Sequence, residues 1–233
     1  DGSLFAAASS DQSLHCWELA SGSKVLHIVP ESALSEDNER ITSLAFSSDR
    51  QQLIVCHSSG LLAAWSLRDS HLLWRIQLSP PSTGPVLAKS VAVCPDDSGR
   101  LAVAFNNGSV AILVGSSKAK PLYADPFPGS AMAPVTAMLW MPTRDRLIIG
   151  NNLGVLGVWN TATNALAGGV VAHRGHIHRL VASPLGNCFA SVSYDHTARI
   201  WDAIKGRPVT EPLRHDDDLY DAAFSPDGRT LAT

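Results

Sequence analysis

Side chains that could carry chemistry gather in the last third of the sequence. His173, Ser191 and Asp195 are the residue types of a catalytic triad, in which a histidine activates a serine and an acid orients the histidine. A serine nucleophile needs an exposed, strained turn with oxyanion donors nearby, whereas Ser191 stands inside an apolar, strand-like run. We therefore interpret these residues as a structural hydrogen-bonded group and expect no catalytic residue.

Histidines in the pattern HxxHxH raise a second possibility, a metal site. In an extended strand His176 and His178 point to the same side, and Asp218 could add a carboxylate from the next repeat. Zinc normally requires three or four closely placed ligands, and no second cluster of such residues appears. We expect His173 to be structural and the other two histidines to lie on an exposed rim, with no metal and no other cofactor.

The run His215-Asp216-Asp217-Asp218 also has two interpretations. A short charged run between strands is usually a solvated connection. The same carboxylates could instead attract basic segments of a partner. The sequence leaves both open.

These residues belong to a repeat that extends along the whole chain. Trp17, Trp65, Trp159 and Trp201 share one register, with Leu113 in the third unit, at intervals of 42–48 residues. Each full unit contains four short β-rich runs separated by turn residues, which predicts antiparallel strands and requires no helix. In the second unit the runs are ITSLAF (41–46), QLIVCH (52–57), LLAAWS (61–66) and HLLWRI (71–76). This spacing is typical of four-stranded propeller blades.

The predicted fold is an all-β propeller with about five blades of four antiparallel strands in this chain. The expected units are approximately 1–36, 37–83, 84–130, 131–172, 173–214 and a partial unit 215–233. Because the sequence begins and ends within a repeat, we favour a part of a longer ring over a closed ring of five blades.

Composition narrows the class of protein and partner. Apolar residues make up 45% of the chain and charged residues 17%, which favours strands covered on both faces. A net charge of −3 and scattered lysines argue against nucleic acid as a partner. Neither a membrane-spanning apolar run nor a signal peptide is visible, so we expect no membrane association. The cysteines stand far apart in apolar runs, which predicts reduced thiols in a cytoplasmic protein.

Two segments, AHRGHIHRLVASPLGNCFASVSYDHTARIWD (172–202) and RHDDDLYDAAFSPDGRTLAT (214–233), resemble blades of WD-repeat β-propellers. The resemblance implies a ring of six to eight blades, with further blades or domains in the parent chain. It also implies a hydrogen-bonded chain inside the blade, made of His173, Ser191, Asp195 and Trp201. Because a buried carboxylate is costly unless it accepts hydrogen bonds, we expect histidine, serine and backbone N–H groups to surround Asp195.

By the same resemblance, certain positions of each unit line the narrow top face of the propeller. In this sequence they are Arg40, Thr42, Ser58, Asn106, Pro134, Thr136, Asn152, His176, His178, Tyr194, Asp218 and Tyr220. Tyrosine and arginine are enriched among residues that dominate protein interfaces. The resemblance thus predicts a protein-binding top face.

Three functions are compatible with these observations. The expected one is a non-catalytic scaffold that presents top-face residues and loops to a protein or peptide partner, because rigid strands reduce the entropy lost on docking. A propeller-based metal-dependent hydrolase would instead need histidine and acidic residues that converge from several blades. The third is a structural or sensor segment of a larger multidomain signalling protein, for which changes in the top face would leave binding intact.

Overall fold

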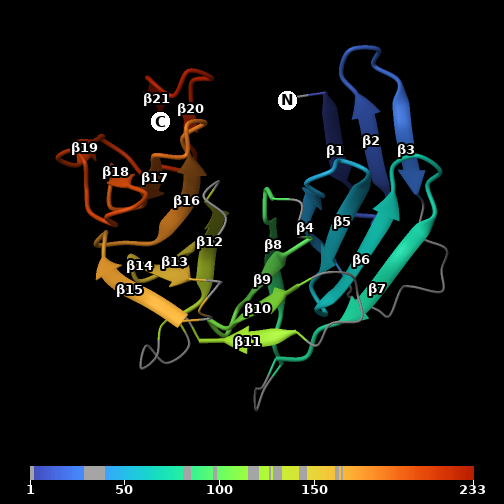
Figure 1. Ribbon diagram of the computed structural model, residues 1–233, viewed down its shortest axis with the longest axis horizontal. Coiled ribbons are helices and arrows are strands. Elements are labelled where there is room, and N and C mark those ends of the chain that lie inside the picture. Colours follow the sequence, from blue (N-terminus) through green and yellow to red (C-terminus); the bar gives the residue numbers. More distant parts are fainter. Residues whose placement is uncertain are drawn as a thin grey trace.

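Six antiparallel sheets follow one another along the chain. The computed structural model describes residues 3–28, 40–80, 85–96, 99–114, 121–125, 127, 133–141, 146–160, 163 and 165–233. Every regular element within these ranges is a strand. Figure 1 shows the sheets in sequence order around an arc, with the N-terminal and C-terminal sheets on either side of its opening. The predicted all-β propeller of antiparallel blades is therefore confirmed.

The first three sheets cover the N-terminal half. Sheet 1 consists of β1 (Leu4–Ala8), β2 (Leu14–Glu18) and β3 (Lys24–Ile28). Sheet 2 consists of β4 (Ile41–Phe46), β5 (Gln52–His57), β6 (Leu61–Ser66) and β7 (Leu72–Gln77). Sheet 3 consists of β8 (Ala88–Val93), β9 (Leu101–Phe105), β10 (Val110–Leu113) and β11 (Leu122–Ala124).

The other three sheets hold the residues singled out above. Sheet 4 consists of β12 (Val135–Trp140), β13 (Arg146–Asn151), β14 (Val155–Asn160) and β15 (Ala165–Val171). Sheet 5 consists of β16 (Ile177–Ala182), β17 (Cys188–Ser193), β18 (Thr197–Asp202) and β19 (Leu213–Arg214). Sheet 6 consists of β20 (Ala223–Phe224) and β21 (Leu231–Ala232).

Each described sheet falls within one of the six units expected from the sequence. The unit limits at 36/37, 83/84 and 130/131 lie outside the described residues, so the assignment of these limits stays a prediction. Sheets 2 to 5 have the expected four strands, whereas sheet 1 has three and sheet 6 has two among the described residues.

The first strand of each sheet lies toward the axis of the arc. Contacts between sheets run from β4 to β8, from β8 to β12, from β12 to β16 and from β16 to β20. The last strands, such as β7 and β15, lie at the outer edge (Figure 1).

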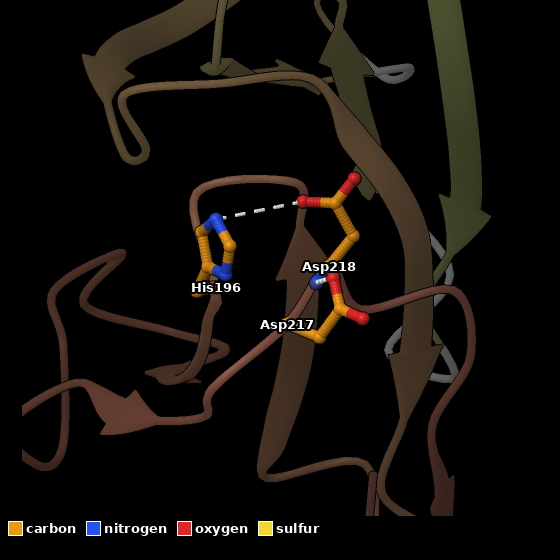
Figure 2. Close-up of side chains that lie close together, drawn as sticks. All are labelled: His196, Asp217 and Asp218. Atoms are coloured by element: carbon orange, nitrogen blue, oxygen red, sulfur yellow. Dashed lines mark hydrogen bonds and ion pairs between the residues drawn. The ribbon is translucent and has the colours of Figure 1, made fainter.

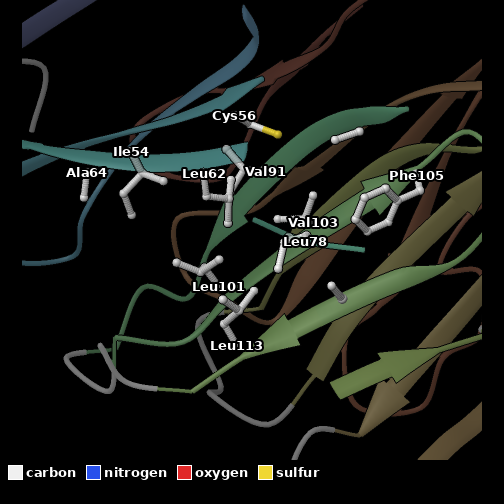
Figure 3. Packing of buried hydrophobic residues seen from close by; sticks show 12 residues of the cluster. Ile54, Cys56, Leu62, Ala64, Leu78, Val91, Leu101, Val103, Phe105 and Leu113 are labelled. Atoms are coloured by element: carbon white, nitrogen blue, oxygen red, sulfur yellow. The ribbon is translucent and has the colours of Figure 1, made fainter. Parts of the chain in front are cut away.

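Apolar side chains fill the spaces between neighbouring sheets. All five residues of β9 are buried, because this strand is covered on both faces. Ile54 and Leu62 of sheet 2 belong to one buried cluster with Val91, Val103 and Phe105 of sheet 3, and Figure 3 shows Leu62 next to Val91. Similar layers separate the other sheets, so each blade is held mainly by burial of apolar surface against its neighbours.

One backbone conformation recurs at a tight turn, which lies between β1 and β2 in sheet 1 and between the second and third strands in sheets 2 to 5. The residue with positive φ is Gln12, Gly60, Gly108, Gly154 or His196, in sheets 1 to 5 respectively. At Gly154 an added Cβ would overlap the carbonyl oxygen of His173, so glycine is required there. In sheet 5 this residue is His196, which directly follows Asp195, the aspartate of the turn.

Candidate functional site

A continuous chain of hydrogen bonds runs through sheet 5. The indole Nε1 of Trp201 donates to Oγ of Ser191 at 2.9 Å, and that hydroxyl lies 2.7 Å from Nε2 of His173. On the other side of the ring, Nδ1 of His173 donates to the carboxylate of Asp195 at 3.1 Å. The four residues named by the resemblance therefore lie together, and they connect β18, β17, the segment before β16 and the β17–β18 turn.

Asp195 accepts most of its hydrogen bonds from its own turn. The hydroxyl of Thr197 donates to Oδ1 at 2.6 Å, the backbone N–H of Thr197 to the same oxygen at 3.1 Å, and the backbone N–H of Arg174 to Oδ2 at 2.9 Å. Thr197 is not among the residues predicted from the sequence. The hydroxyl expected beside the carboxylate was that of Ser191, which instead bonds to His173. A threonine two residues after a turn aspartate is the signal that could have been used.

The ionisation of this group follows from its surroundings. Burial raises the pKa of Asp195, but hydrogen bonds from Thr197 and Arg174 and the proximity of His173 outweigh burial, and the net pKa is lowered. Burial lowers the pKa of His173, against the opposing charge of Asp195, and so favours the neutral imidazole. A neutral ring with a proton on Nδ1 can donate to Asp195 and accept from Ser191 at the same time.

This geometry stabilises the blade and is unsuited to catalysis. Ser191 is 0% exposed, so a substrate carbonyl has no access to its hydroxyl. The hydroxyl also accepts the indole N–H of Trp201, and both nitrogens of His173 already have partners. We therefore assign the four residues to the architecture of the blade.

The predicted top-face residues in sheets 2 to 4 bond mostly within the chain. Oγ of Ser58 accepts the backbone N–H of Arg40 at 3.1 Å, and the hydroxyl of Thr42 donates to a backbone carbonyl of β5. The side chain of Asn106 accepts the N–H of Leu87 at 2.8 Å. The hydroxyl of Thr136 donates to the carbonyl of Ile177, and the carbonyl of Pro134 accepts the N–H of Asn152. These contacts fix loops and the junctions between blades.

In sheets 5 and 6 the predicted residues form a different surface, made of aromatic rings. We define the aromatic surface as the side chains of His176, His178, Tyr194 and Tyr220. The ring of Tyr194 is stacked on that of His176 with centroids 4.9 Å apart, and its centroid lies 5.3 Å from those of His178 and Tyr220. Tyr220 meets His178 edge-on at 5.4 Å and is 59% exposed. Four residues from three chain segments thus form one contiguous surface.

Hydrogen bonds and an acidic group complete this surface. Nδ1 of His178 donates to the backbone carbonyl of Tyr220 at 2.6 Å, which fixes sheet 6 against β16. Burial raises the pKa of the Tyr194 hydroxyl, and the nearby groups Tyr220 and Asp218 raise it further. Asp218 borders the aromatic surface: the N–H of the next residue, Leu219, donates to the carbonyl of Ser193, the residue before Tyr194, at 3.3 Å.

Potential metal ligands do not assemble as the histidine pattern suggested. His173 is engaged on both ring nitrogens, and Nδ1 of His178 is bonded to a carbonyl. Asp218 instead lies near His196 and Asp217, and one ligand atom from each is within 4.8 Å of the others (Figure 2). His196 and Asp217 are exposed, and Nε2 of His196 is 3.7 Å from Asp218. These three side chains border the aromatic surface at the β17–β18 turn.

Comparison with known proteins agrees with this geometry. Residues 168–202, which contain the hydrogen-bonded group, match the family described as WD domain, G-beta repeat. Residues 168–202 of the chain are therefore a WD repeat. The other sheets are also antiparallel but keep little of the group: Asp11 retains the aspartate in sheet 1, whereas Ser59, Asn107 and Leu153 stand where sheet 5 has Asp195.

Relatives of this chain are longer proteins. Periodic tryptophan protein 2 of Arabidopsis thaliana is 23% identical over 233 residues, which is 100% of this chain and 20% of that protein. Coronin-7 of Rattus norvegicus is 42% identical over 84 residues, which is 34% of this chain and 8% of that protein. The chain thus spans a small part of the relatives it matches.

A solved structure supports the same fold. A chain from the crystal structure of the Mitotic Checkpoint Complex superposes with a TM-score of 0.80 at 15% sequence identity, over 98% of this chain and 67% of that one. The described residues of the chain include no helix of sufficient length and hydrophobicity to span a membrane.

Proposed function

We propose that this chain is a non-catalytic scaffold that binds a protein or peptide partner through the aromatic surface. The observation that carries the proposal is the assembly of His176, His178, Tyr194 and Tyr220 into one partly exposed group of rings. Buried contacts between large rings contribute strongly to protein interfaces, and tyrosine is enriched at the residues that dominate them.

The rigidity of the surface supports this function. Tyr194 is held by two histidine rings, and the backbone of Tyr220 is held by His178. Side chains already fixed in contact with one another lose little rotational freedom when a partner binds. The propeller supplies the fixed positions, and the partner supplies the complementary groups.

Two further observations favour a binding role over catalysis. The serine of the Ser-His-Asp group is fully buried, and the histidine pattern that suggested a metal-dependent hydrolase does not converge on one point. The structural neighbour belongs to a complex of proteins, which is in keeping with a fold used for assembly. Further blades or domains in the parent protein are part of this proposal. The cytoplasmic location expected from the free cysteines stays a prediction.

Affinity capture with the full-length parent protein tests the proposal. Tyr194→Ala combined with Tyr220→Ala should reduce recovery of at least one partner by about tenfold or more, because two interface tyrosines are lost together. Phe5→Ala is the matched control, since Phe5 is an exposed aromatic residue at 53% on sheet 1. Equal recovery of every partner by the double variant and the control would refute the proposed surface.

A further inference from the structure

The charge at the border of the aromatic surface indicates what kind of side chain it receives. Asp218 lies beside the segment of Tyr194, because the N–H of Leu219 donates to the carbonyl of Ser193 at 3.3 Å, and Asp216 and Asp217 are exposed in the same segment. The face of an aromatic ring attracts cations, and so does a carboxylate. Rings and carboxylates side by side therefore form a surface complementary to a positively charged group.

The basic and imidazole groups near the aromatic surface do not remove its preference for a positively charged group. Arg179, the basic residue of β16, pairs with Asp221 at 3.3 Å. Burial and the neighbouring His178 lower the pKa of His176, which favours its neutral form. His196 lies 3.7 Å from Asp218, longer than a hydrogen bond, so the carboxylate keeps capacity to accept hydrogen bonds from a ligand.

The arrangement of the rings distinguishes between the possible cations. A methylated ammonium group is bound by a cage of rings around an empty centre. Here the ring centroids are only 4.9–5.9 Å apart, the separation of rings in direct contact, so the group forms a platform instead of a cage. A planar guanidinium can stack on such a platform and at the same time direct its N–H groups to a carboxylate beside it. A compact ammonium group can donate to the carboxylate but has no plane with which to stack.

We propose that the aromatic surface and Asp218 together bind an arginine side chain of the partner. The guanidinium stacks on the exposed ring of Tyr220, next to Tyr194, and donates hydrogen bonds to the Asp218 carboxylate. This inference rests on the proposed function and specifies the chemistry of the partner: a peptide segment in which one arginine is the main anchor. The contact involves no covalent bond, so the binding affinity of the peptide measures the contact directly.

Selection of short random peptides displayed on phage, with the full chain as bait, tests the inference. The enriched peptides should share an arginine. A peptide synthesised from this set should lose about tenfold in affinity when its arginine is replaced by citrulline, a neutral group of the same shape, and about fivefold when it is replaced by lysine. Asp218→Asn should weaken binding of the arginine peptide by a similar factor, whereas Asp221→Asn, the matched control in the same segment before β20, should not.

Different outcomes of the peptide selection would contradict the arginine proposal and the scaffold proposal. Peptides that depend on Tyr194 and Tyr220 but contain no common arginine, or bind equally well with citrulline or lysine, would overturn the arginine proposal and leave the scaffold proposal standing. If every selected peptide also binds the Tyr194→Ala, Tyr220→Ala variant, or if no peptide is selected, both the arginine proposal and the scaffold proposal are overturned. The citrulline comparison changes only the peptide, so it holds even if a protein variant folds poorly.

Discussion

Replacing Trp201 with alanine is expected to lower the free energy of unfolding by about 3–5 kcal/mol. The indole is 2% exposed, packs against Phe189 with ring centroids 6.2 Å apart, and lies in the apolar layer between sheets 4 and 5. Its loss leaves a cavity between two blades. It also leaves the buried hydroxyl of Ser191 without the N–H group it accepts.

Denaturant unfolding monitored by circular dichroism measures this effect. Trp17→Ala is the matched control, because Trp17 occupies the same register in sheet 1 but is only partly buried. Trp201→Phe should fall between wild type and Trp201→Ala, since it keeps most of the apolar contact and loses the donor. Equal losses for Trp17→Ala and Trp201→Ala would contradict the role given to the sheet 5 packing and hydrogen bonds.

Replacing Asp195 with alanine should destabilise the protein by about 3 kcal/mol at neutral pH. The carboxylate accepts hydrogen bonds from Thr197, from the N–H of Arg174 and from His173. Removing it leaves the buried side chains of His173 and Thr197 without their acceptor, whereas the N–H of Arg174 is exposed to water. Thermal and denaturant unfolding of the variant and of wild type measure the difference.

The pH dependence of this difference provides an internal check. The pKa of Asp195 is lowered from 3.8 in the folded protein, so its contribution is present above the unfolded pKa and is lost as pH falls through the folded pKa. The gap between wild type and Asp195→Ala should therefore narrow below about pH 4. Asp11→Ala is the matched control: Asp11 sits in the equivalent turn of sheet 1, is exposed, and accepts the backbone N–H of Ser13. A loss for Asp11→Ala as large as that for Asp195→Ala would refute the assignment.

Sequence periodicity was sufficient for the fold because strands and turns leave local signals. In sheet 2 the expected runs 41–46, 52–57 and 61–66 coincide with β4, β5 and β6, and the fourth run is displaced by one residue. Each strand is a short apolar or alternating run with a polar turn on either side, and packing against neighbouring blades keeps that pattern. The His173, Ser191 and Trp201 positions follow from the same register.

The other contacts of the site do not repeat from blade to blade, so the periodicity of the sequence does not predict them. Ser58, Asn106 and Thr136 were placed at the top face by register, but register does not tell whether a polar side chain is free or bonded to its own backbone. The positions of His196 and Asp218 depend on the path of the segment 214–222 against the β17–β18 turn. That path is set by tertiary packing of Leu219 and Ala222 on sheet 5.

Hydrogen exchange of the full chain, alone and bound to a captured partner or selected peptide, tests most directly whether the aromatic surface is the binding site. On binding, we expect slower amide hydrogen exchange in residues 176–178, 193–197 and 216–221, and little change in sheets 1 to 3. Protection in sheets 1 to 3 without protection around Tyr194 and Tyr220 would contradict it.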